Sequence, residues 1–568
     1  MAIEPITAPS ARSSVWRAGP TCFLFSLILS LAPNSIPAVE VEFNHPSGFY
    51  STTFNLALSS PSTSATIYYT TNGDSPSPAT AIRYGSPVPI ATTTVVRAAA
   101  FAQNVPVTEP AAKTYLFAND ILKQTGAPFP KTWGTNEGWP VPAYYTMTIS
   151  SNTSRQLLVE GLRSIPSLSI VTDAQNLFGD KIGIYSHPLE RGGDWERPVS
   201  LELLDSPSQT GFHLNCGLRI HGGTSRNPKE SPKHSFRLVF KPRYGSATLR
   251  FPLFGPDGAQ GFDSLVLRAG NNNSWLDSNA EGRRRADYLR DEWMRRSMLA
   301  MGHPSPRGRF VHVYLNGIYW GVYNLCERPG ASWLAAQEQR SPSAYDFRKA
   351  DEIESGDTVA WNRMLALANS GLSDARNYQA LGQQFDLPEF VDFLILNLYA
   401  GNSDWDRSAN WCAARLRTPE GKFRFFVWDA ERTLEELEAN TIDFDDDESP
   451  PRLFQKLSEN AEFRALFATR ARQLLFDRGP LSPESAAQRY QALAATLKPA
   501  IVAEAARWGN YRQDVHQYKT GPFVSYTAKD HWQPEIDRLL TRYFPQRRDI
   551  VLDQFHARGL FPSGNTPR

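Results

Sequence analysis

The sequence predicts a multidomain chain in which a small N-terminal β-sandwich precedes a larger α+β body with a helical C-terminal portion. Three observations support this fold class. Residues 51–100 are rich in Ser and Thr, hold only three charged residues and alternate apolar with polar positions, which is typical of antiparallel strands. Residues from about 166 to 435 mix strand patterns with helix patterns. After about residue 452 the helical spacing of apolar residues dominates.

Composition and charge exclude several classes of protein. The 568 residues are 41% hydrophobic and 21% charged, so the chain can form packed cores and is neither disordered nor fibrous. The formal net charge of +1 argues against attraction to nucleic acid by overall basicity, and we expect no nucleic-acid partner. Cys216, Cys326 and Cys412 have no CxxC spacing, which disfavours a zinc site and allows at most one disulfide among them.

The N-terminal segment has the pattern of a secretory signal. Arg12 and Arg17 precede an apolar run of about eleven residues from Cys22 to Ala32, and Ala38 provides a small residue at a plausible cleavage position. We therefore expect a signal peptide over 1–38 and a secreted or extracytoplasmic protein, in the periplasm or at the cell surface. No later segment has 18 consecutive apolar residues, so we expect no transmembrane span in the mature protein.

Strand patterns at 54–58, 66–70 and 95–101, with a turn at 71–74, predict the β-sandwich over 40–117. The stretch from Ile67 to Pro76 (IYYTTNGDSP), followed by Arg83-Tyr84 and Val96-Arg97-Ala98, resembles the chitobiase C-terminal-like, fibronectin-III-associated module. Asn72 stands where that family usually has Asp. The resemblance implies an accessory module, which tethers the protein to a cell-surface polysaccharide or matrix and carries no catalysis.

Residues 118–165 are rich in Pro, Gly and Trp and are interpreted as a connection. The body then extends over 166–568, with a core at 166–435 and a helical tail at 452–560. Helical spacing predicts helices at 287–300 and 389–399 within the core and at 452–475, 483–507 and 533–556 in the tail.

The stretch from Asn397 to Glu431 carries the strongest chemical signal. An apolar helix ends near Gly401, a polar loop holds Asp404, Asp406 and Asn410, and a hairpin then leads to Asp429. Phosphoryl transfer needs an Asp near the acceptor hydroxyl, and an Asn and a second Asp that converge on Mg²⁺. The hairpin returns the chain to the loop, so Asp429 is expected near it. Asp404 and Asp406 are both candidates for the catalytic position, because neither spacing to Asn410 is that of ordinary protein kinases.

A Gly-rich turn upstream is a second candidate element. A strand ends in Gly222-Gly223, and the next strand begins after Lys233. Exposed backbone N–H groups in such a turn can bind phosphate, and a nearby Lys can pair with it.

Several motifs in this order resemble the CotH kinase family, named for a spore-coat protein. They are Gly183-Ile-Tyr185, the stretch from Trp195 to Glu202, the stretch from Arg219 to Arg226 followed by Lys233-His-Ser-Phe-Arg237, Tyr288 to Glu292, Val313 to Tyr323 with Glu327-Arg328, and Asn402-Ser-Asp404 with Asn410 and Trp428-Asp429. The resemblance implies an atypical protein-kinase-like fold that uses ATP and Mg²⁺ (or Mn²⁺) to phosphorylate hydroxyl side chains of secreted proteins.

The resemblance also implies roles for individual residues. Asp404 matches the catalytic Asp, and Asn410 and Asp429 match the metal ligands. Lys233 matches the lysine that binds the ATP phosphates, with Arg219 and Arg237 as helpers, Glu292 as the acid that orients Lys233, and Glu327 either facing the nucleotide base or pairing with Arg328. Glu431 stands where the family often has Asp, so its role as a ligand is left open.

Other interpretations remain. A non-catalytic surface or matrix protein with the same fold is the main alternative. A glycosidase would use Asp404 and Asp406 beside Trp405.

The acidic run 443–448 lacks EF-hand spacing and is interpreted as a solvated loop. The arginines between 283 and 296 are interpreted as a solvated helix face or a patch for an acidic partner.

Overall fold

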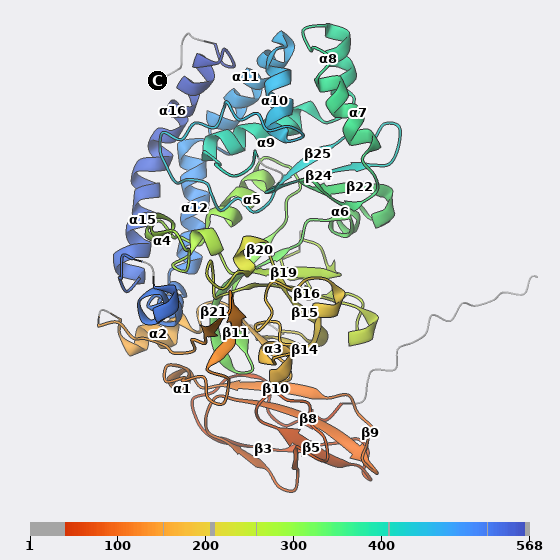
Figure 1. Cartoon of the computed structure of the whole chain (residues 1–568), viewed down its shortest axis with the longest axis vertical. Coiled ribbons are helices and arrows are strands. Elements are labelled where there is room, and N and C mark those ends of the chain that lie inside the picture. Colours follow the sequence, from red (N-terminus) through yellow and green to blue (C-terminus); the bar gives the residue numbers. More distant parts are fainter. Residues whose placement is uncertain are drawn as a thin grey trace, which may run out of the picture. The chain divides into compact units, whose positions relative to one another are not determined.

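The computed structural model describes residues 40–562 except 152, 205–210, 257, 407–408 and 520. The signal peptide expected at 1–38 lies outside the described residues. From Glu40 onward the chain clusters into one unit, and it combines an N-terminal strand-rich region with an α+β body rich in helices (Figure 1). The predicted fold class is therefore confirmed. No helix in the described part of the chain is long and apolar enough to cross a membrane.

The N-terminal region is built from short antiparallel strands. Its main sheet includes β5 (Thr66–Thr70), β8 (Thr94–Ala102) and β10 (Ala111–Leu116), and β3 (Phe54–Leu56) pairs with β7 (Val88–Ile90) in a smaller sheet. Every second side chain of β5 and β8 packs into a core with residues of β3 and β10. The alternation in the sequence had predicted this arrangement, since successive strand residues face opposite sides of a sheet.

The segment 118–165 is folded rather than a simple connection. It holds the hairpin of β11 (Thr132–Asn136) and β12 (Trp139–Pro142) and the helix α2 (Arg155–Gly161). Trp133 is 1% exposed and packs against Trp320, with its indole N–H donated to the hydroxyl of Tyr145. The Pro and Gly residues correctly indicate turns, but the aromatic residues between them belong to the core of the body.

The centre of the body is a closed seven-stranded barrel. The strands are β13 (Ser167–Val171), β14 (Arg197–Leu204), β15 (His213–His221), β16 (Ser235–Val239), β19 (Ser264–Arg268), β21 (Ile318–Glu327) and β20 (Gly308–Leu315), in this spatial order. Leu218, Phe236 and Leu267 fill the interior. Because side chains alternate along a strand, Arg219, Arg237 and Arg268 lie on the outer face.

A second, four-stranded sheet covers part of this outer face. Its order is β23 (Glu352–Ser355), β22 (Tyr345–Lys349), β24 (Trp411–Leu416) and β25 (Arg424–Val427). Side chains of this sheet and of α6 (Ala331–Glu338) form one apolar cluster with Val266 and Cys326 of the barrel. Two of the candidate residues, Asn410 and Asp429, flank the hairpin of β24 and β25 in this sheet.

Helices lie along one side of the barrel and over the second sheet (Figure 1). α5 (Arg290–Ala300) contacts both α9 (Leu387–Ala400) and β25. The tail contains α10 (Pro450–Ser458), α11 (Ala461–Leu475), α12 (Pro483–Leu497), α13 (Ile501–Trp508), α15 (Gln533–Arg538) and α16 (Phe544–Ala557). α13 packs on β21 of the barrel, α12 packs on α5, and α11 and α16 pack on α9. The tail therefore contacts both the barrel and the helices next to the second sheet.

Candidate active site

The loop after α9 is held in a tight arrangement by its two asparagines. Gly401 ends the helix in the left-handed conformation, with φ of 57°, which glycine adopts without strain. The buried amide of Asn402 donates to Asn397 Oδ1 (2.8 Å) and accepts from the N–H of Asp404 (3.2 Å). Asn410 Nδ2 then donates to the carbonyl oxygen of Asp404 (2.8 Å). The loop therefore brings Asp404 and Asn410 together, as expected.

The hairpin of β24 and β25 places Asp429 next to this loop. Trp411 pairs with Val427, so the register puts Asn410 opposite Trp428, one residue before Asp429. Asp429 has a φ of 61°, a conformation that costs energy for a residue with a Cβ atom, and its carboxylate is 41% exposed. The sequence-based expectation that Asp429 lies close to the 402–410 loop agrees with this register.

Arg268, at the end of β19, is the partner of Asp429 and was missed in the sequence. Its guanidinium contacts Asp429 (2.5 Å), Glu431 (2.8 Å) and Asp291 on α5 (3.2 Å), and it lies over the Trp428 ring. Burial disfavours the charged guanidinium, but the three carboxylates outweigh this effect and hold the pKa of Arg268 well above its usual value. The sequence does carry a signal for Arg268. It is a cation at the end of a strand, and a later helix has an acid in its first turn.

This arrangement is similar to part of the site in which protein kinases hold nucleotide phosphates and metal. In those enzymes a cation on a strand of the N-terminal lobe pairs with an acid on the following helix, beside a metal-binding Asp. Here Asp291 also accepts a hydrogen bond from the backbone N–H of Ala430 (3.0 Å). The position of α5 thus fixes the backbone directly after Asp429.

Glu431 is a buried acid in an acidic neighbourhood. It accepts hydrogen bonds from Arg268 and from the backbone N–H of Asn272. Burial raises its pKa most; Arg268 opposes this, and Asp429 and Asp291 raise the pKa further, to about 7. Glu431 thus holds Arg268 and the 271–273 turn.

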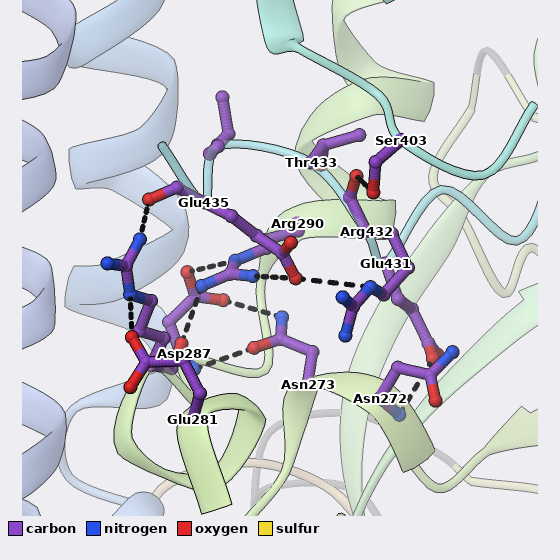
Figure 2. Close-up of polar contacts among 12 residues, drawn as sticks. Asn272, Asn273, Glu281, Asp287, Arg290, Ser403, Glu431, Arg432, Thr433 and Glu435 are labelled. Carbon is purple, nitrogen blue, oxygen red and sulfur yellow. Dashed lines mark hydrogen bonds and ion pairs between the residues drawn. The ribbon is translucent and has the colours of Figure 1, made fainter. Parts of the chain in front are cut away.

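A second polar network, shown in Figure 2, fixes the chain after Asp429. The buried guanidinium of Arg290 pairs with Asp287 (3.1 Å) and Glu435 (3.4 Å), and Arg432 pairs with Glu435 (3.3 Å). The backbone N–H of Ser403 donates to the carbonyl of Arg432 (3.0 Å). The 431–435 segment therefore connects the start of α5 to the loop that carries Asp404.

Only some of the arginines between 283 and 296 lie on the solvated face that the sequence suggested: the side chains of Arg284 and Arg296 are 60% and 42% exposed. Arg283, Arg290 and Arg295 are at most 1% exposed. Each has carboxylate or carbonyl partners that satisfy it in the interior, as buried charges require. Most of these partners are close in sequence, and Arg290 also pairs with the distant Glu435 and Glu535.

Lys233 occupies a different environment from the one expected. Its ammonium is completely buried and pairs with Glu504 on α13 (2.6 Å), and it also donates to the carbonyl of Val322 (2.6 Å). The centroid of the Tyr323 ring lies 4.6 Å from the ammonium nitrogen. Burial lowers the pKa of Lys233, although Glu504 opposes this effect. The structure therefore places Lys233 in a contact between the barrel and the helical tail.

The expected pairing of Glu292 with Lys233 is wrong. Glu292 pairs with Arg295 (2.7 Å) and Arg296 (2.7 Å) on its own helix, and Glu504 takes the place beside Lys233. The sequence could not indicate Glu504, because it lies 271 residues after Lys233. Glu292 belongs instead to a chain of ion pairs that continues through Arg295 to Asp291.

Glu327, at the end of β21, does not pair with Arg328. It is 1% exposed, and one carboxylate oxygen accepts from the backbone N–H of Arg307 (2.8 Å) and the indole N–H of Trp333 (3.1 Å). Arg328 pairs with Glu354 (2.7 Å). Both Glu327 and Arg328 line a cavity of about 300 Å³ with Ser264 and Trp333, at the point where the barrel passes into α6.

Arg219 and Arg237 form the centre of a cationic face on the outside of the barrel. The two residues are directly opposite each other on β15 and β16. Burial, and then the charges of Arg328 and Arg219, lower the pKa of Arg237 to about 10, and its Nε has no hydrogen-bond partner among the described residues. Two neighbouring guanidinium groups without enough carboxylate partners favour the binding of an anion between them.

Carboxylate and amide oxygens of the kind held by Asp429 and Asn410 suit Mg²⁺ or Mn²⁺. In the described ranges, no group of three or more His, Cys, Asp or Glu side chains is placed to hold a metal without further ligands. A divalent ion here would need oxygen atoms from a phosphate as well, as is usual for Mg²⁺.

Two family models match the chain. The model described as CotH kinase protein matches residues 218–551, and the model of the chitobiase/β-hexosaminidase C-terminal domain matches residues 45–111. No curated protein matches the chain. The first match covers more than half of the sequence and includes the barrel strands from β16 onward, the 402–410 loop and Asp429. The second covers most of the N-terminal sandwich.

Proposed function

Because the chain belongs to the CotH kinase protein family, we propose that it is a secreted atypical kinase that transfers the γ-phosphate of ATP to hydroxyl side chains of extracytoplasmic proteins. The observation that carries this proposal is the meeting of Arg268, Asp291 and Asp429 beside the loop of Asp404 and Asn410. These groups come from β19, α5 and the two ends of one hairpin.

In the proposed reaction Asp404 accepts the proton of the acceptor hydroxyl, or orients that hydroxyl, as its oxygen forms a bond to the γ-phosphorus. The bond between the γ-phosphorus and the bridging oxygen breaks, and ADP leaves. Asn410 and Asp429 would hold Mg²⁺ or Mn²⁺, which would neutralise charge on the phosphate oxygens. Arg268 keeps Asp429 in place and is the cation nearest to it.

The cationic face of Arg219 and Arg237 supports binding of the remaining phosphate charge. Among the described residues, the carboxylates near these two guanidinium groups do not offset the loss of solvent, and the pKa of each arginine is lowered. Lys233 is buried against Glu504 and is therefore the weaker candidate for a phosphate contact. The cavity beside Glu327 and Trp333 provides space for the nucleotide base at the opposite end of β19. Glu292 supports the site only through Arg295 and Asp291.

The N-terminal module supports a proposal about location. It matches the chitobiase/β-hexosaminidase C-terminal domain, and together with the predicted signal peptide it suggests tethering to a cell-surface polysaccharide or matrix. A secreted protein would then be the substrate.

A non-catalytic surface or matrix-binding protein is the second candidate function. The observation in its favour is that Lys233, the expected phosphate-binding lysine, is enclosed between the barrel and α13. In this alternative the fold is kept for binding, and nucleotide affects neither stability nor labelling.

The deciding experiment is an autophosphorylation assay with labelled ATP and Mg²⁺ or Mn²⁺. We expect labelling of the wild-type protein and a loss of at least about 100-fold in Asp429→Ala, because the metal loses a ligand. Asp549→Ala, at an exposed carboxylate on α16, is the matched control and should label normally. Equal labelling of the wild type and Asp429→Ala, or no labelling together with no nucleotide-induced rise in Tm, would contradict the kinase proposal.

A further inference from the structure

An open groove of about 1510 Å³ lies along α5, outside the proposed active site. Its walls come from the 251–256 segment, from α5, from residues 307–309 at the start of β20, and from α12. Nothing in the proposed reaction uses this groove. It is large enough for several residues of an extended peptide.

The groove is strongly cationic. Its described lining residues include four arginines and a single carboxylate: Arg296, Arg307, Arg309, Arg489 and Glu292. Neither Arg307 nor Arg489 forms an ion pair with a described residue. Arg489 donates to the hydroxyl of Ser297 (3.0 Å) and to the carbonyl of Pro480 (2.5 Å), and burial lowers its pKa to about 10. A positive charge such as that of Arg307 or Arg489, with no ion pair among the described residues, favours an anionic ligand.

One wall of the groove is apolar. Phe251, Phe254 and Leu299 are half-buried and line it beside the arginines. An extended peptide that alternates acidic and apolar side chains fits such a surface, because its carboxylates and its apolar groups face different walls. Single-stranded nucleic acid fits less well, since it stacks its bases on exposed aromatic faces, and neither phenylalanine is among the exposed large side chains.

We propose that this groove binds an acidic peptide segment of a partner protein, with its carboxylates on Arg307 and Arg489 and an apolar side chain against Phe251 and Phe254. The groove also borders the ion pairs of α5. Arg296, with its side chain 42% exposed, pairs with Glu292, and Glu292 is joined through Arg295 to Asp291. A peptide here would therefore contact the helix that positions Asp429.

The test uses the mature chain and a fluorescein-labelled octapeptide of alternating Glu and Phe, which has no hydroxyl side chain and cannot be phosphorylated. Binding is followed by fluorescence anisotropy without nucleotide, so the result does not depend on kinase activity. Arg307→Glu is the test variant, because the side chain of Arg307 has no ion pair to lose. Arg376→Glu, at a side chain that is 90% exposed and outside the groove lining, is the matched control.

We expect saturable binding that weakens as salt is added, and a loss of affinity of roughly tenfold or more in Arg307→Glu but not in Arg376→Glu. Equal affinity in the two variants, or no binding up to about 1 mM peptide at low salt, would overturn the proposal. Equal binding of a Lys-Phe octapeptide, or tighter binding of a labelled oligothymidine of the same charge, would also overturn it. Absence of autophosphorylation in the wild-type protein, with peptide binding intact, would contradict only the kinase proposal.

Discussion

Arg268 is the residue on which most of the site depends. It is the counter-charge of three carboxylates from separate segments, Asp291, Asp429 and Glu431. At most 9% of the side chain of Arg268, Asp291 or Glu431 is exposed, whereas Asp429 is half exposed. The buried acids need the arginine to remain charged, and the exposed acid remains available to a metal.

We predict that Arg268→Ala lowers the free energy of unfolding by about 3–5 kcal/mol, because it leaves buried carboxylates without a cation. Arg268→Lys should cost less, since it keeps the charge but loses the forked geometry. Urea unfolding of both variants measures the difference. A loss below about 1 kcal/mol in Arg268→Ala would contradict this account.

The raised pKa of Glu431 predicts a pH dependence of stability. Between its unfolded value, about 4.3, and the folded value of about 7, the native state holds a proton that the unfolded state has released. The stability contribution of this group is therefore present below about pH 4 and is lost as the pH rises to 7.

Glu431→Gln should remove this loss, so the variant should gain stability relative to wild type as the pH rises from about 4.5 to 7. Chemical unfolding at several pH values measures the difference. Glu438→Gln, at an exposed position nearby in sequence, serves as the control with no such trend. A constant difference between Glu431→Gln and the wild type would contradict the prediction.

At the scale of elements, α5 connects the barrel to the hairpin of β24 and β25. Its Asp291 contacts both Arg268 and the backbone after Asp429, and its Glu292 packs against Gly308 at the start of β20. The helix thus contacts both β20 of the barrel and β25 of the second sheet. A change at its border with β20 should therefore reach the active site.

Gly308→Ala tests this border. A Cβ at position 308 would lie 2.3 Å from Glu292 Oε2 and 3.0 Å from Arg295 Nη1, so the ion pairs of α5 must shift. We expect a loss of about 1–3 kcal/mol in the free energy of unfolding, together with weaker autophosphorylation. Gly85→Ala, where a Cβ meets nothing within 4 Å, is the control. If Gly308→Ala left the free energy of unfolding unchanged, α5 would be able to shift without a cost in stability.

At the scale of the whole molecule, the helical tail is part of the body rather than an appendage. α13 provides Glu504, which pairs with Lys233 and accepts the backbone N–H of Val322. Arg507, on the same helix, donates to the carbonyls of Tyr319 and Tyr144. One short helix therefore joins the barrel strands to the 118–165 segment.

The role of Lys233 can be decided by one pair of variants. If its ammonium serves the contact with α13, Lys233→Met should lower the free energy of unfolding by about 3–5 kcal/mol by leaving Glu504 buried and unpaired. Lys233→Met combined with Glu504→Gln should recover part of this loss. Normal stability of Lys233→Met with a loss of nucleotide binding would instead restore the phosphate-binding role expected from the sequence.

The sequence by itself determined the order of the domains, the strand-rich character of the N-terminal module, most helices of the tail, and the loop of Asp404 and Asn410 with the hairpin to Asp429. These features depend on local periodicity, turn residues and short spacings, which can be read along the chain.

Only the tertiary structure decided the partners of the charged residues: Arg268 with Asp429, Lys233 with Glu504, and Glu292 with Arg295 and Arg296. The first two pairs join residues more than 150 positions apart. The third lies within one helix, but the choice between it and Lys233 depends on where the barrel places α5. Burial makes the charges of Arg268, Lys233 and Glu292 require partners, and the fold decides which partner lies within reach.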